Sequence, residues 1–501
     1  MFKNVLISVS DKTGLLEFLK KVQPIRIVST GGTAKYLTDN GFKVVDVSEQ
    51  TGAPEVMGGR IKTLHPRVHM ALLSRSGNLE DAQLLRDEEI APFDLLICNL
   101  YPFEQAVFEQ VDGAELIEKI DIGGPSMLRA AGKNFLQLTV ICDPTDYNWI
   151  AEGGSLSLEQ RKHLAAKVFA HTAAYDTLVA EKLGAGMGPE FSLAGAKVQD
   201  LRYGENPQQL ASWYRKKGFS EGLHAAKVLQ GKVLSYNNIL DLDVATALVA
   251  SFHDAAAVAV KHGNPCGVAE DSTLNSALAK VLQADPVSIF GGIVAVNRKI
   301  TEIEAALLSP LFLECLIAPD YSEQALDIFS KKKNFRVLRW PRLLQAHQRE
   351  DVRTINGGFL VQTADLFESE AEKWKWIGQT PELAVIKDLQ FAEKVCASLK
   401  SNAIVIVKNG QTVGLGMGQV NRVEAVSHAV ERMQSHFGSL KDVVLASDAF
   451  FPFPDSIQKA SEAGVRWIVQ PGGSLKDEQI FAAAKEYGIG MAVTGVRHFR
   501  H

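Results

Sequence analysis

The sequence predicts an α/β protein of more than one domain, in which the first domain contains a parallel sheet. The chain has 501 residues, more than one compact core usually holds, so roughly two to four domains are expected. Short apolar runs alternate with helical patterns through the first third of the chain, and a glycine-rich break then precedes a second α/β region. Alternating strands and helices are typical of a parallel sheet that helices cover on both faces.

The first domain begins with strand and helix patterns in alternation. The strand-like apolar runs are Val5–Val9, Arg26–Val28, Leu95–Asn99 and Leu138–Cys142, and helical spacing is found at Leu15–Val22 and Ala34–Thr38. In parallel sheets, ligands bind beyond the carboxyl ends of the strands. The loops that follow these runs are therefore the first place to look for functional residues.

The best candidate for a domain linker is Gly184–Pro189, where glycines and a proline interrupt the pattern after the helical segment Leu164–Leu183;. Apolar runs from Ala255–Val260 onward indicate a second mixed α/β region, and the polar stretch Gln345–Thr354 is expected to divide it. The expected boundaries are 1–190 for the first domain and 197–501 for the second, whose lobes cover roughly 197–345 and 355–501. No internal repeat is expected.

Composition excludes several classes of protein. The formal net charge is −5, so the basic surplus of a nucleic-acid-binding protein is absent. The sequence has no apolar segment of bilayer-spanning length and no signal-peptide pattern at its start;. The five cysteines form no Cys-x-x-Cys pair, which argues against disulfides and a zinc site and favours a reducing compartment. We expect a cytoplasmic protein without a metal or a membrane partner.

Two loops of the first domain have the residue types of a phosphate site. Each follows a strand and opens a helix, where backbone N–H groups and the positive helix end attract anions. Their candidate ligand-binding residues are Ser10, Lys12, Thr13, Gly14, Ser29, Thr30, Gly31, Gly32 and Thr33. The alternative is that Ser10 and Thr33 merely cap helices, but two such loops on neighbouring strands favour phosphate binding.

Further polar residues follow later elements of the same domain. Arg60 could bind phosphate in a bidentate way, and Lys62 could act as a point charge or proton donor;. His65 and His69 have helical metal-ligand spacing, but no third ligand accompanies them in the sequence;. The other candidates for this pocket are Thr63, Asn99, Tyr101, Asp121, Gly123, Gly124 and Lys133.

In the second domain, Lys261 and His262 end a buried strand beside glycine and proline turns, where such residues can form an acid–base pair;. An isolated Lys-His dipeptide is more often an ordinary surface pair. A Pro-Cys sequence at Cys266 is similar to that of zinc deaminases, but their second cysteine is missing because position 269 is Ala;. Three phenylalanines at 450–453 could sandwich a planar ring or plug a core;.

These motifs together resemble one family: bifunctional purine-biosynthesis enzymes that join phosphoribosylaminoimidazolecarboxamide (AICAR) formyltransferase to IMP cyclohydrolase. The resemblance covers essentially the whole chain. It rests on Ser8–Gly14, Ile61–Pro66, Asn99–Phe103, Asp121–Gly124, Arg202–Asn206, Lys261–Gly267, Phe290–Gly292, Ser447–Asp455 and Thr494–His501. It implies a methylglyoxal-synthase-like first domain with a parallel sheet, and a transformylase with two cytidine-deaminase-like lobes that lack zinc.

The resemblance also implies what the protein does and with which partners. The enzyme would transfer a formyl group from 10-formyltetrahydrofolate, a reduced folate, to the 5-amino group of AICAR, and would then cyclise and dehydrate formyl-AICAR to IMP. It would work as a homodimer, and its chemistry would need no metal. The resemblance assigns ring closure to Lys62, Tyr101, Asp121 and Lys133. In the transformylase it implies that the ribonucleotide is held by Arg202, Tyr203, Asn238, Gly291, Glu314, Asn402, Arg422, Phe450 and Arg497, and that Phe451, Pro452 and Asp455 lie near the folate.

One position departs from the family pattern. The family usually has histidine after the proline of its Arg-Tyr-Gly-x-Asn-Pro motif, whereas this chain has Gln208, which can form hydrogen bonds but cannot titrate. Two other functions stay open. One is a lyase acting on a sugar phosphate with Cys266 and His262 as a nucleophile pair, and the other is a nucleotide-sensing protein that has lost one activity.

The chemistry suggests roles for the transformylase residues. The acceptor amine is a weak nucleophile, so formyl transfer needs a base, an oxyanion donor and a proton for the leaving nitrogen. We hypothesise that His262 accepts the amine proton, that Lys261 supplies positive charge or the leaving-group proton, and that Asn402 hydrogen-bonds the formyl oxygen.

Overall fold

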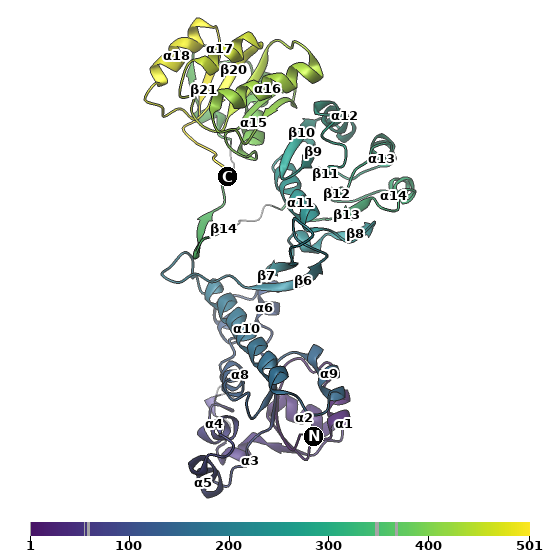
Figure 1. The fold of residues 1–501 in the computed structure, drawn as a ribbon, viewed down its shortest axis with the longest axis vertical. Helices are drawn as coiled ribbons and strands as arrows, with labels where there is room; N and C mark the ends of the chain where they lie inside the picture. The colour runs from purple at the N-terminus through teal and green to yellow at the C-terminus, as the bar shows by residue number, and fades with distance from the viewer. Residues whose placement is uncertain (1, 55, 58–60, 346–349, 366–368) are drawn as a thin grey trace. The chain divides into compact units, whose positions relative to one another are not determined.

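The structure, a computed structural model, describes residues 2–54, 56–57, 61–345, 350–365 and 369–501 (Figure 1). The chain forms two compact units. The first unit contains residues 1–196 and 214–220, and the second contains residues 197–213 and 221–501. No helix among the described residues is long and apolar enough to cross a membrane.

The first unit is built on a five-stranded sheet in the order β3-β2-β1-β4-β5, and all of its neighbouring strands run parallel. The strands are β1 (Asn4–Ser8), β2 (Arg26–Ser29), β3 (Val44–Asp46), β4 (Leu95–Cys98) and β5 (Thr139–Ile141). This confirms the expected parallel sheet. The chain moves outward from β1 through β2 to β3 and then returns to place β4 on the other side of β1. Ligands in such sheets bind at the point where the strand order reverses, so the loops after β1 and β4 are the expected position of a site.

The helices of the first unit cover this sheet. They are α1 (Leu15–Val22), α2 (Gly31–Asp39), α3 (Val47–Thr51), α4 (Pro66–Leu73), α5 (Leu79–Asp87), α6 (Phe103–Phe108), α7 (Gly113–Ile117), α8 (Gly123–Lys133), α9 (Tyr147–Glu152) and α10 (Leu158–Lys182). Figure 1 shows α4, α8 and α10 in contact on one side and α1 and α9 in contact on the other. Because both faces are covered, strand residues such as Leu6 and Ile7 are buried without alternation;.

Residues 214–220 rejoin the first unit, which the sequence analysis did not foresee. They include the end of β7 (Ala211–Lys216), which pairs with β6 (Gly195–Leu201) in a two-stranded sheet. Glu104 of α6 accepts hydrogen bonds from Arg215 Nη1 at 2.6 Å, Lys217 Nζ at 2.9 Å and the Gly218 amide at 3.0 Å. One carboxylate therefore fastens the returning segment to α6.

The second unit is built on a twelve-stranded sheet in the order β16-β21-β20-β19-β17-β18-β10-β9-β11-β12-β13-β8. The strands are β8 (Lys227–Gln230), β9 (Ala255–Lys261), β10 (Asn264–Asp271), β11 (Ile293–Val296), β12 (Cys315–Ala318), β13 (Arg336–Arg339), β16 (Lys375–Ile377), β17 (Ile404–Lys408), β18 (Gln411–Gly416), β19 (Val443–Ser447), β20 (Val465–Gln470) and β21 (Gly490–Val493). A separate hairpin is formed by β14 (Glu350–Ile355) and β15 (Gly358–Thr363).

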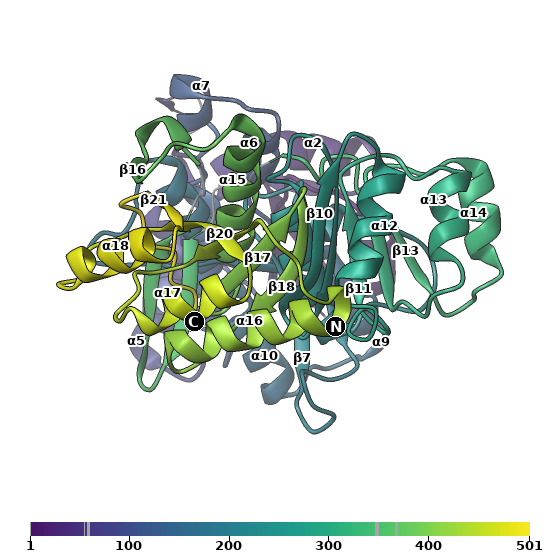
Figure 2. The same ribbon diagram turned by 90° about the horizontal axis from the view of Figure 1, so that it is seen from above.

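Helices cover both faces of the large sheet (Figure 2). They are α11 (Tyr236–Val249), α12 (Leu274–Ala284), α13 (Glu302–Leu308), α14 (Glu323–Ser330), α15 (Leu383–Ala397), α16 (Arg422–Phe437), α17 (Asp455–Glu462) and α18 (Asp477–Glu486). Along β9, Val258 joins the core beneath α11 and α15, whereas its neighbours Ala257 and Ala259 join the core beneath α12. Alternate side chains of a strand point to opposite faces of the sheet, so each strand contributes to two cores.

The second unit contains an internal repeat, contrary to the expectation from sequence. The order α11-β9-β10-α12-β11-α13-β12-α14-β13 of the first lobe is repeated as α15-β17-β18-α16-β19-α17-β20-α18-β21 in the second. The two lobes meet where β10 and β18 run antiparallel, with Ala269 opposite Gln411. Thr412 Oγ1 strengthens this seam because it accepts the Val268 N–H at 3.0 Å and donates to the Val268 carbonyl at 3.2 Å.

Candidate active sites

The loop after β1 is tied to the end of β4 by Asn99. Asn99 Oδ1 accepts the amides of Ser10 and Asp11 at 2.7 and 3.0 Å, and its Nδ2 donates to the Asp11 carbonyl at 2.8 Å. The buried Thr33 Oγ1 bonds both the amide and the carbonyl of Val9, which links α2 to the same loop. Gly14, at φ 69°, then opens α1. The two predicted phosphate loops are thus joined at the strand-order reversal.

Lys62 and Thr63 lie against glycines that open helices. A Cβ on Gly31 would lie 2.9 Å from Lys62 Nζ, and a Cβ on Gly123 would lie 2.7 Å from Thr63 Oγ1. A side chain at Gly31 or Gly123 would therefore require Lys62 or Thr63 to shift. Lys62 is therefore close to the start of α2, where backbone amides and the helix dipole favour an anion.

An open pocket of about 360 Å³ adjoins this lysine, and its lining includes Thr30, Gly31, Asp46, Lys62 and His65. His65 caps α4, because its Nδ1 accepts the Arg67 amide at 3.2 Å. Burial lowers the pKa of His69. Among the described residues, no group of three or more His, Cys, Asp or Glu side chains is arranged to hold a metal ion.

Asp121 is held at the start of α8 by backbone amides. Its Oδ1 accepts the Gly124 N–H at 2.8 Å, and its Oδ2 accepts the Tyr101 N–H at 3.3 Å. Burial raises the pKa of this carboxyl, although the two amide hydrogen bonds act in the opposite direction. A partly buried carboxyl with a raised pKa is a candidate for proton transfer.

The structure does not bring every predicted residue of the first unit to this edge. Lys133 is exposed at the far end of α8, about 15 Å along the helix axis from Gly123. Its role in ring closure stays a prediction without geometric support. The Ser29 hydroxyl is fully buried and donates to the Ile7 carbonyl at 2.7 Å, so only the Ser29 backbone could reach a ligand. Arg60 lies outside the described residues.

In the second unit, Lys261 and His262 form the hairpin turn between β9 and β10. His262 is exposed at φ 52° and Gly263 follows at φ 70°. Lys261 is half-buried, and its Nζ donates to the Phe290 carbonyl at 2.7 Å. Asp241 of α11 accepts the Gly263 amide at 2.6 Å, and burial raises the pKa of this carboxyl. The turn thus carries an anchored lysine and, next to it in sequence, an exposed histidine.

Asn402 belongs to a buried polar network in the second lobe. Its Oδ1 accepts a hydrogen bond from Arg422 Nη2 at 2.8 Å, and its Nδ2 donates to the Gln419 carbonyl at 2.7 Å. Arg422 is only 5% exposed and also pairs with Asp448. Arg422 therefore orients Asn402 in this arrangement. The predicted contact of Arg422 with the ribonucleotide stays a prediction.

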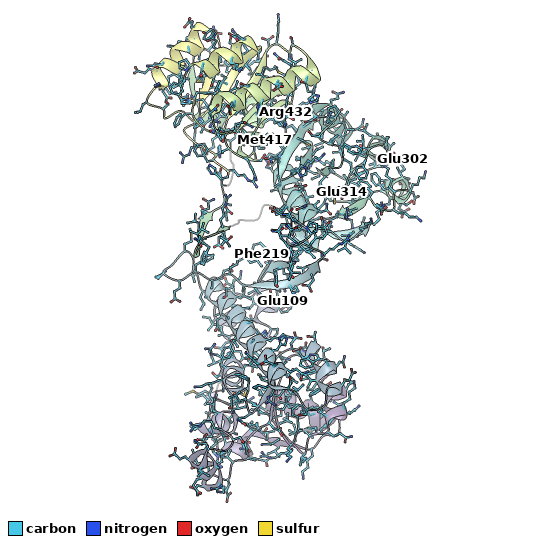
Figure 3. The ribbon with its side chains drawn as sticks, viewed as in Figure 1. Glu109, Phe219, Glu302, Glu314, Met417 and Arg432 are labelled. Carbon is cyan, nitrogen blue, oxygen red and sulfur yellow. The ribbon has the colours of Figure 1, made fainter. Side chains whose placement is uncertain are left out.

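The other predicted nucleotide-binding residues have varied surroundings. Asn238 is buried and forms a reciprocal cap with Ser235 at the start of α11. Glu314, labelled in Figure 3, forms an ion pair with Arg336 Nη1 at 2.8 Å. The residues whose predicted role is neither supported nor opposed by these contacts are Lys12, Thr13, Gly32, Arg202, Tyr203, Gly291, Phe450, Pro452, Asp455 and Arg497.

The prediction for Phe451 needs correction. Its ring is 1% exposed and packs with Ile457 and Ile468 in the core of the second lobe, so it does not present a surface to folate. The apolar character that suggested ligand stacking instead fills a core. Phe453 is the exposed aromatic residue of this turn, at 52%, with Lys476 Nζ 3.9 Å from its ring centroid.

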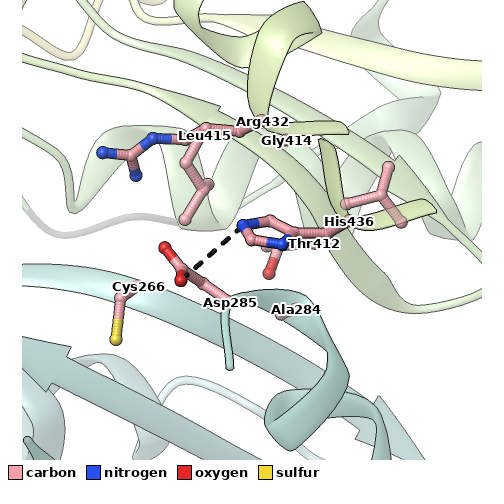
Figure 4. A pocket seen from close by; sticks show the side chains of 9 residues that line it. Cys266, Ala284, Asp285, Thr412, Gly414, Leu415, Arg432 and His436 are labelled. Carbon is pink, nitrogen blue, oxygen red and sulfur yellow. Dashed lines mark ion pairs between the residues drawn. The ribbon is translucent and has the colours of Figure 1, made fainter. Parts of the chain in front are cut away.

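The position of Cys266 opposes the lyase alternative. Its Sγ donates to the Ala259 carbonyl at 3.5 Å, and burial raises its pKa to about 12. Figure 4 shows the small cavity beside it, where His436 Nε2 lies 3.7 Å from Asp285 Oδ1 across the lobe seam. Thiolate is the reactive form of cysteine, so this buried thiol is a poor nucleophile.

Sequence reasoning missed two residues beside these sites. Asp241 holds the Lys261-His262 turn, and the weak sequence repeat of Asp241 and Lys261 as Asp388 and Lys408 could have drawn attention to it. His498 is buried, and its Nδ1 lies 2.8 Å from Asp365 Oδ2. This contact joins segments that are 133 residues apart, and no local pattern predicts it.

The fold defines a class of protein: a two-unit α/β protein whose first unit holds a parallel sheet with a strand-order reversal and whose second unit consists of two repeated lobes. Comparisons with known proteins identify the family. The family model described as "AICARFT/IMPCHase bienzyme" matches residues 131–432, and that of the MGS-like domain matches residues 14–126. The chain therefore belongs to the AICARFT/IMPCHase bienzyme family, and it is a bifunctional enzyme of purine biosynthesis with AICAR formyltransferase and IMP cyclohydrolase activities.

Similar relatives extend over the full chain. The bifunctional purine biosynthesis protein PurH of Bacillus subtilis is 46% identical, with 100% of this chain and 99% of the relative covered. PurH of Caldicellulosiruptor saccharolyticus is also 46% identical, and 100% of both chains is covered. A solved structure entitled "Crystal structure of ForH" is 34% identical over 36% of this chain and 97% of its own, with a TM-score of 0.32.

Proposed function

We propose that the Lys261-His262 turn carries out formyl transfer from 10-formyltetrahydrofolate to the 5-amino group of AICAR. The observation that supports this assignment most is the fixed position of Lys261, whose Nζ donates to the Phe290 carbonyl at 2.7 Å beside the exposed His262. A lysine and a histidine in one turn can serve as proton donor and proton acceptor in one reaction.

The reaction has three requirements, which we assign to His262, Lys261 and Asn402. As the amine nitrogen bonds to the formyl carbon, His262 accepts the amine proton. Lys261 supplies a proton to the folate nitrogen as the carbon–nitrogen bond of the donor breaks. The Asn402 amide retains a second N–H beyond the one accepted by Gln419, and this N–H donates to the developing oxyanion.

Ring closure is assigned to the carboxyl edge of the first sheet. The carboxamide nitrogen of formyl-AICAR attacks its own formyl carbon, so proximity supplies much of the rate. Lys62, near the start of α2, stabilises the oxyanion that forms. Asp121, whose pKa burial raises, transfers a proton as water leaves, with Tyr101 at the same edge. The loops at Ser10–Gly14 and Ser29–Thr33 bind the nucleotide phosphate.

The sharpest test of the transformylase assignment is His262→Asn. The second lobe has Asn409 at the matching turn position with φ 53°, close to the φ of 52° at His262, so asparagine keeps the backbone and removes only the imidazole. Formyl transfer should fall by about 100-fold or more, the usual contribution of a general base. Ring closure of preformed formyl-AICAR in the same protein should be unchanged.

Both rates can be followed by IMP formation, starting from AICAR with the formyl donor or from formyl-AICAR. Asn409→His, at the matching turn, is the control and should leave both rates as they are. Lys261→Ala should also abolish formyl transfer alone. Undiminished formyl transfer in His262→Asn and Lys261→Ala would remove this turn from the mechanism.

The folate partner, the dimer and the location are part of the same proposal. The exposed turn at Pro452, Phe453 and Asp455 offers an aromatic face and polar groups for a pterin;. The family resemblance implies a homodimer, which measurement of the molar mass in solution by light scattering would test. A reduced, cytoplasmic environment agrees with five free cysteines;.

A further inference from the structure

The Lys261-His262 turn has a structural counterpart in the second lobe. The turn Lys261-His262-Gly263 (the first turn) joins β9 to β10, and Lys408-Asn409-Gly410 (the second turn) joins β17 to β18. Their middle residues have φ of 52° and 53°, and their glycines have φ of 70° and 67°. In both turns the lysine and the glycine are half-buried and the middle residue is exposed.

The lysines of the two turns are anchored in the same way. Lys261 Nζ donates to the Phe290 carbonyl and Lys408 Nζ donates to the Lys441 carbonyl, each at 2.7 Å. The strand registers explain the match, because Val260 pairs with Ile293 and Val407 pairs with Val444. Phe290 lies three residues before Ile293, and Lys441 lies three residues before Val444, so the two accepting carbonyls occupy equivalent positions.

One aspartate supports each turn from the preceding helix. Asp241 and Asp388 are both the sixth residue of their helices, α11 and α15. Asp388 Oδ2 accepts the Asn409 amide at 2.8 Å and its Oδ1 accepts the Gly410 amide at 2.7 Å. Asp241 Oδ1 accepts the Gly263 amide at 2.6 Å and also bonds the backbone of His262.

These contacts indicate that Asp241 holds the backbone of the first turn in its conformation. A non-glycine residue at positive φ is uncommon and persists where the surroundings hold it. The carboxylate of Asp241 binds the backbone of the first turn and also interacts electrostatically with His262. The same backbone hydrogen bonding recurs in the second lobe, where the turn has no histidine. The support is thus part of the repeated scaffold, and only the first turn adds an imidazole to it.

We propose that Asp241 is a positioning residue for formyl transfer: by binding the amides of the first turn, it holds Lys261 and His262 in their reactive arrangement. This inference rests on the proposed function of that turn. Asp241 has no direct contact with substrate in this proposal. Its removal should therefore lower kcat, because small displacements of reacting groups are costly, and should change KM little.

The test compares Asp241→Ala with Asp388→Ala in the full-length enzyme. The two substitutions remove the same kind of amide hydrogen bonds, but Asp388 lies in the lobe whose turn lacks a histidine. Asp241→Ala should lower the formyl-transfer kcat by about 10- to 100-fold, with KM for AICAR within about twofold of the parent. Asp388→Ala should keep the parent kcat, while both variants should lose a similar amount of Tm.

Two further variants guard against a folding defect. Asp241→Asn keeps an oxygen acceptor for the turn and should retain formyl transfer within about fivefold of the parent. If Asp241→Ala does not fold, Asp241→Glu and Asp388→Glu replace the alanine pair, since one extra methylene displaces each turn. Ring closure in the first unit is the internal standard for enzyme concentration in every case.

The outcomes separate this inference from the function on which it rests. Full kcat in Asp241→Ala, or an equal loss in Asp388→Ala, overturns the positioning role. If His262→Asn is inactive while Asp241→Ala is fully active, only the positioning role fails. If His262→Asn is fully active, the proposed function of the turn fails first.

Discussion

At the scale of single residues, several side chains take their roles from one close neighbour. Lys62 Nζ lies where a side chain at Gly31 would reach. The Asp121 carboxylate is positioned by hydrogen bonds from two backbone amides. His498 is set by Asp365, which lies on a distant segment. Changes at such positions should therefore affect one site and leave the other unit of the protein unchanged.

Gly31→Ala should displace Lys62. The new Cβ would lie 2.9 Å from Lys62 Nζ, and Gly31 has φ of 45°, so the ammonium would shift away from the start of α2. We expect the rate of ring closure to fall by about 10-fold or more, with formyl transfer retained. Gly41→Ala is the matched control, because Gly41 has φ of 84° and open space around it. A similar loss of ring closure in both variants would contradict the steric explanation.

The pair of His498 and Asp365 should make stability depend on pH. Burial lowers the pKa of His498, but the hydrogen bond and charge of Asp365 outweigh burial and raise it above the ordinary value of 6.5. The stabilisation is therefore complete below pH 6.5 and is lost as pH rises through the folded-state pKa. Asp365→Asn should lower Tm more at about pH 6 than at about pH 9. A difference in Tm that grew with pH would contradict this assignment.

At the scale of elements, the second unit depends on the contact between β10 and β18. Ala269 pairs with Gln411 in this contact, and the Thr412 side chain bonds both backbone groups of Val268. The lobes also meet where Lys280 Nζ donates to the Asn409 carbonyl at 2.6 Å. The seam thus combines backbone pairing with side-chain hydrogen bonds.

Thr412→Val should weaken this seam. Valine matches threonine in shape, but it leaves the buried Val268 amide and carbonyl without their partner, which should cost about 1–3 kcal/mol of unfolding free energy. Denaturant unfolding would measure this loss. Thr246→Val is the control, since the Thr246 hydroxyl donates to carbonyls of its own helix, those of Leu242 at 2.7 Å and Asp243 at 3.3 Å. An equal effect of both substitutions would show that the seam has no special role.

At the scale of the whole molecule, the chain passes between the two units three times. It leaves the first unit after residue 196, returns to it at residues 214–220, and belongs to the second unit from residue 221 onward. Glu104 holds the returning segment through Arg215, Lys217 and the Gly218 amide. Burial raises the pKa of Glu104, but these three partners lower it more strongly, to about 2. The contact belongs to neither catalytic site.

Glu104→Gln should therefore reduce stability and leave both activities intact at moderate temperature. The carboxylate stabilises the fold at pH values above its unfolded pKa of 4.5, and this contribution is lost as pH falls toward about 2;. We expect a loss of about 1–3 kcal/mol at neutral pH, and a smaller one at about pH 3. Urea unfolding at both values measures it, and an equal loss at both would contradict the role of the charge.

The sequence by itself determined the alternating strands and helices of the first unit and the loops at their carboxyl ends. Leu15–Val22 is a helix with the predicted bounds, and β1 and β2 lie within one residue of the predicted runs. Spacing, caps and glycine turns are local, so neighbouring residues carry that information. The full set of ordered motifs likewise indicated the family, and the comparisons confirm it.

Only the tertiary structure decided the partners of these residues. Burial placed Phe451 in a core, and contacts across long stretches of chain joined Asn99 to Ser10, His498 to Asp365 and Glu104 to Arg215. The repeat of the second unit became visible through the order of its helices and strands and through its strand registers. Hydrogen bonds between distant segments depend on how whole elements pack, and no local pattern contains that information.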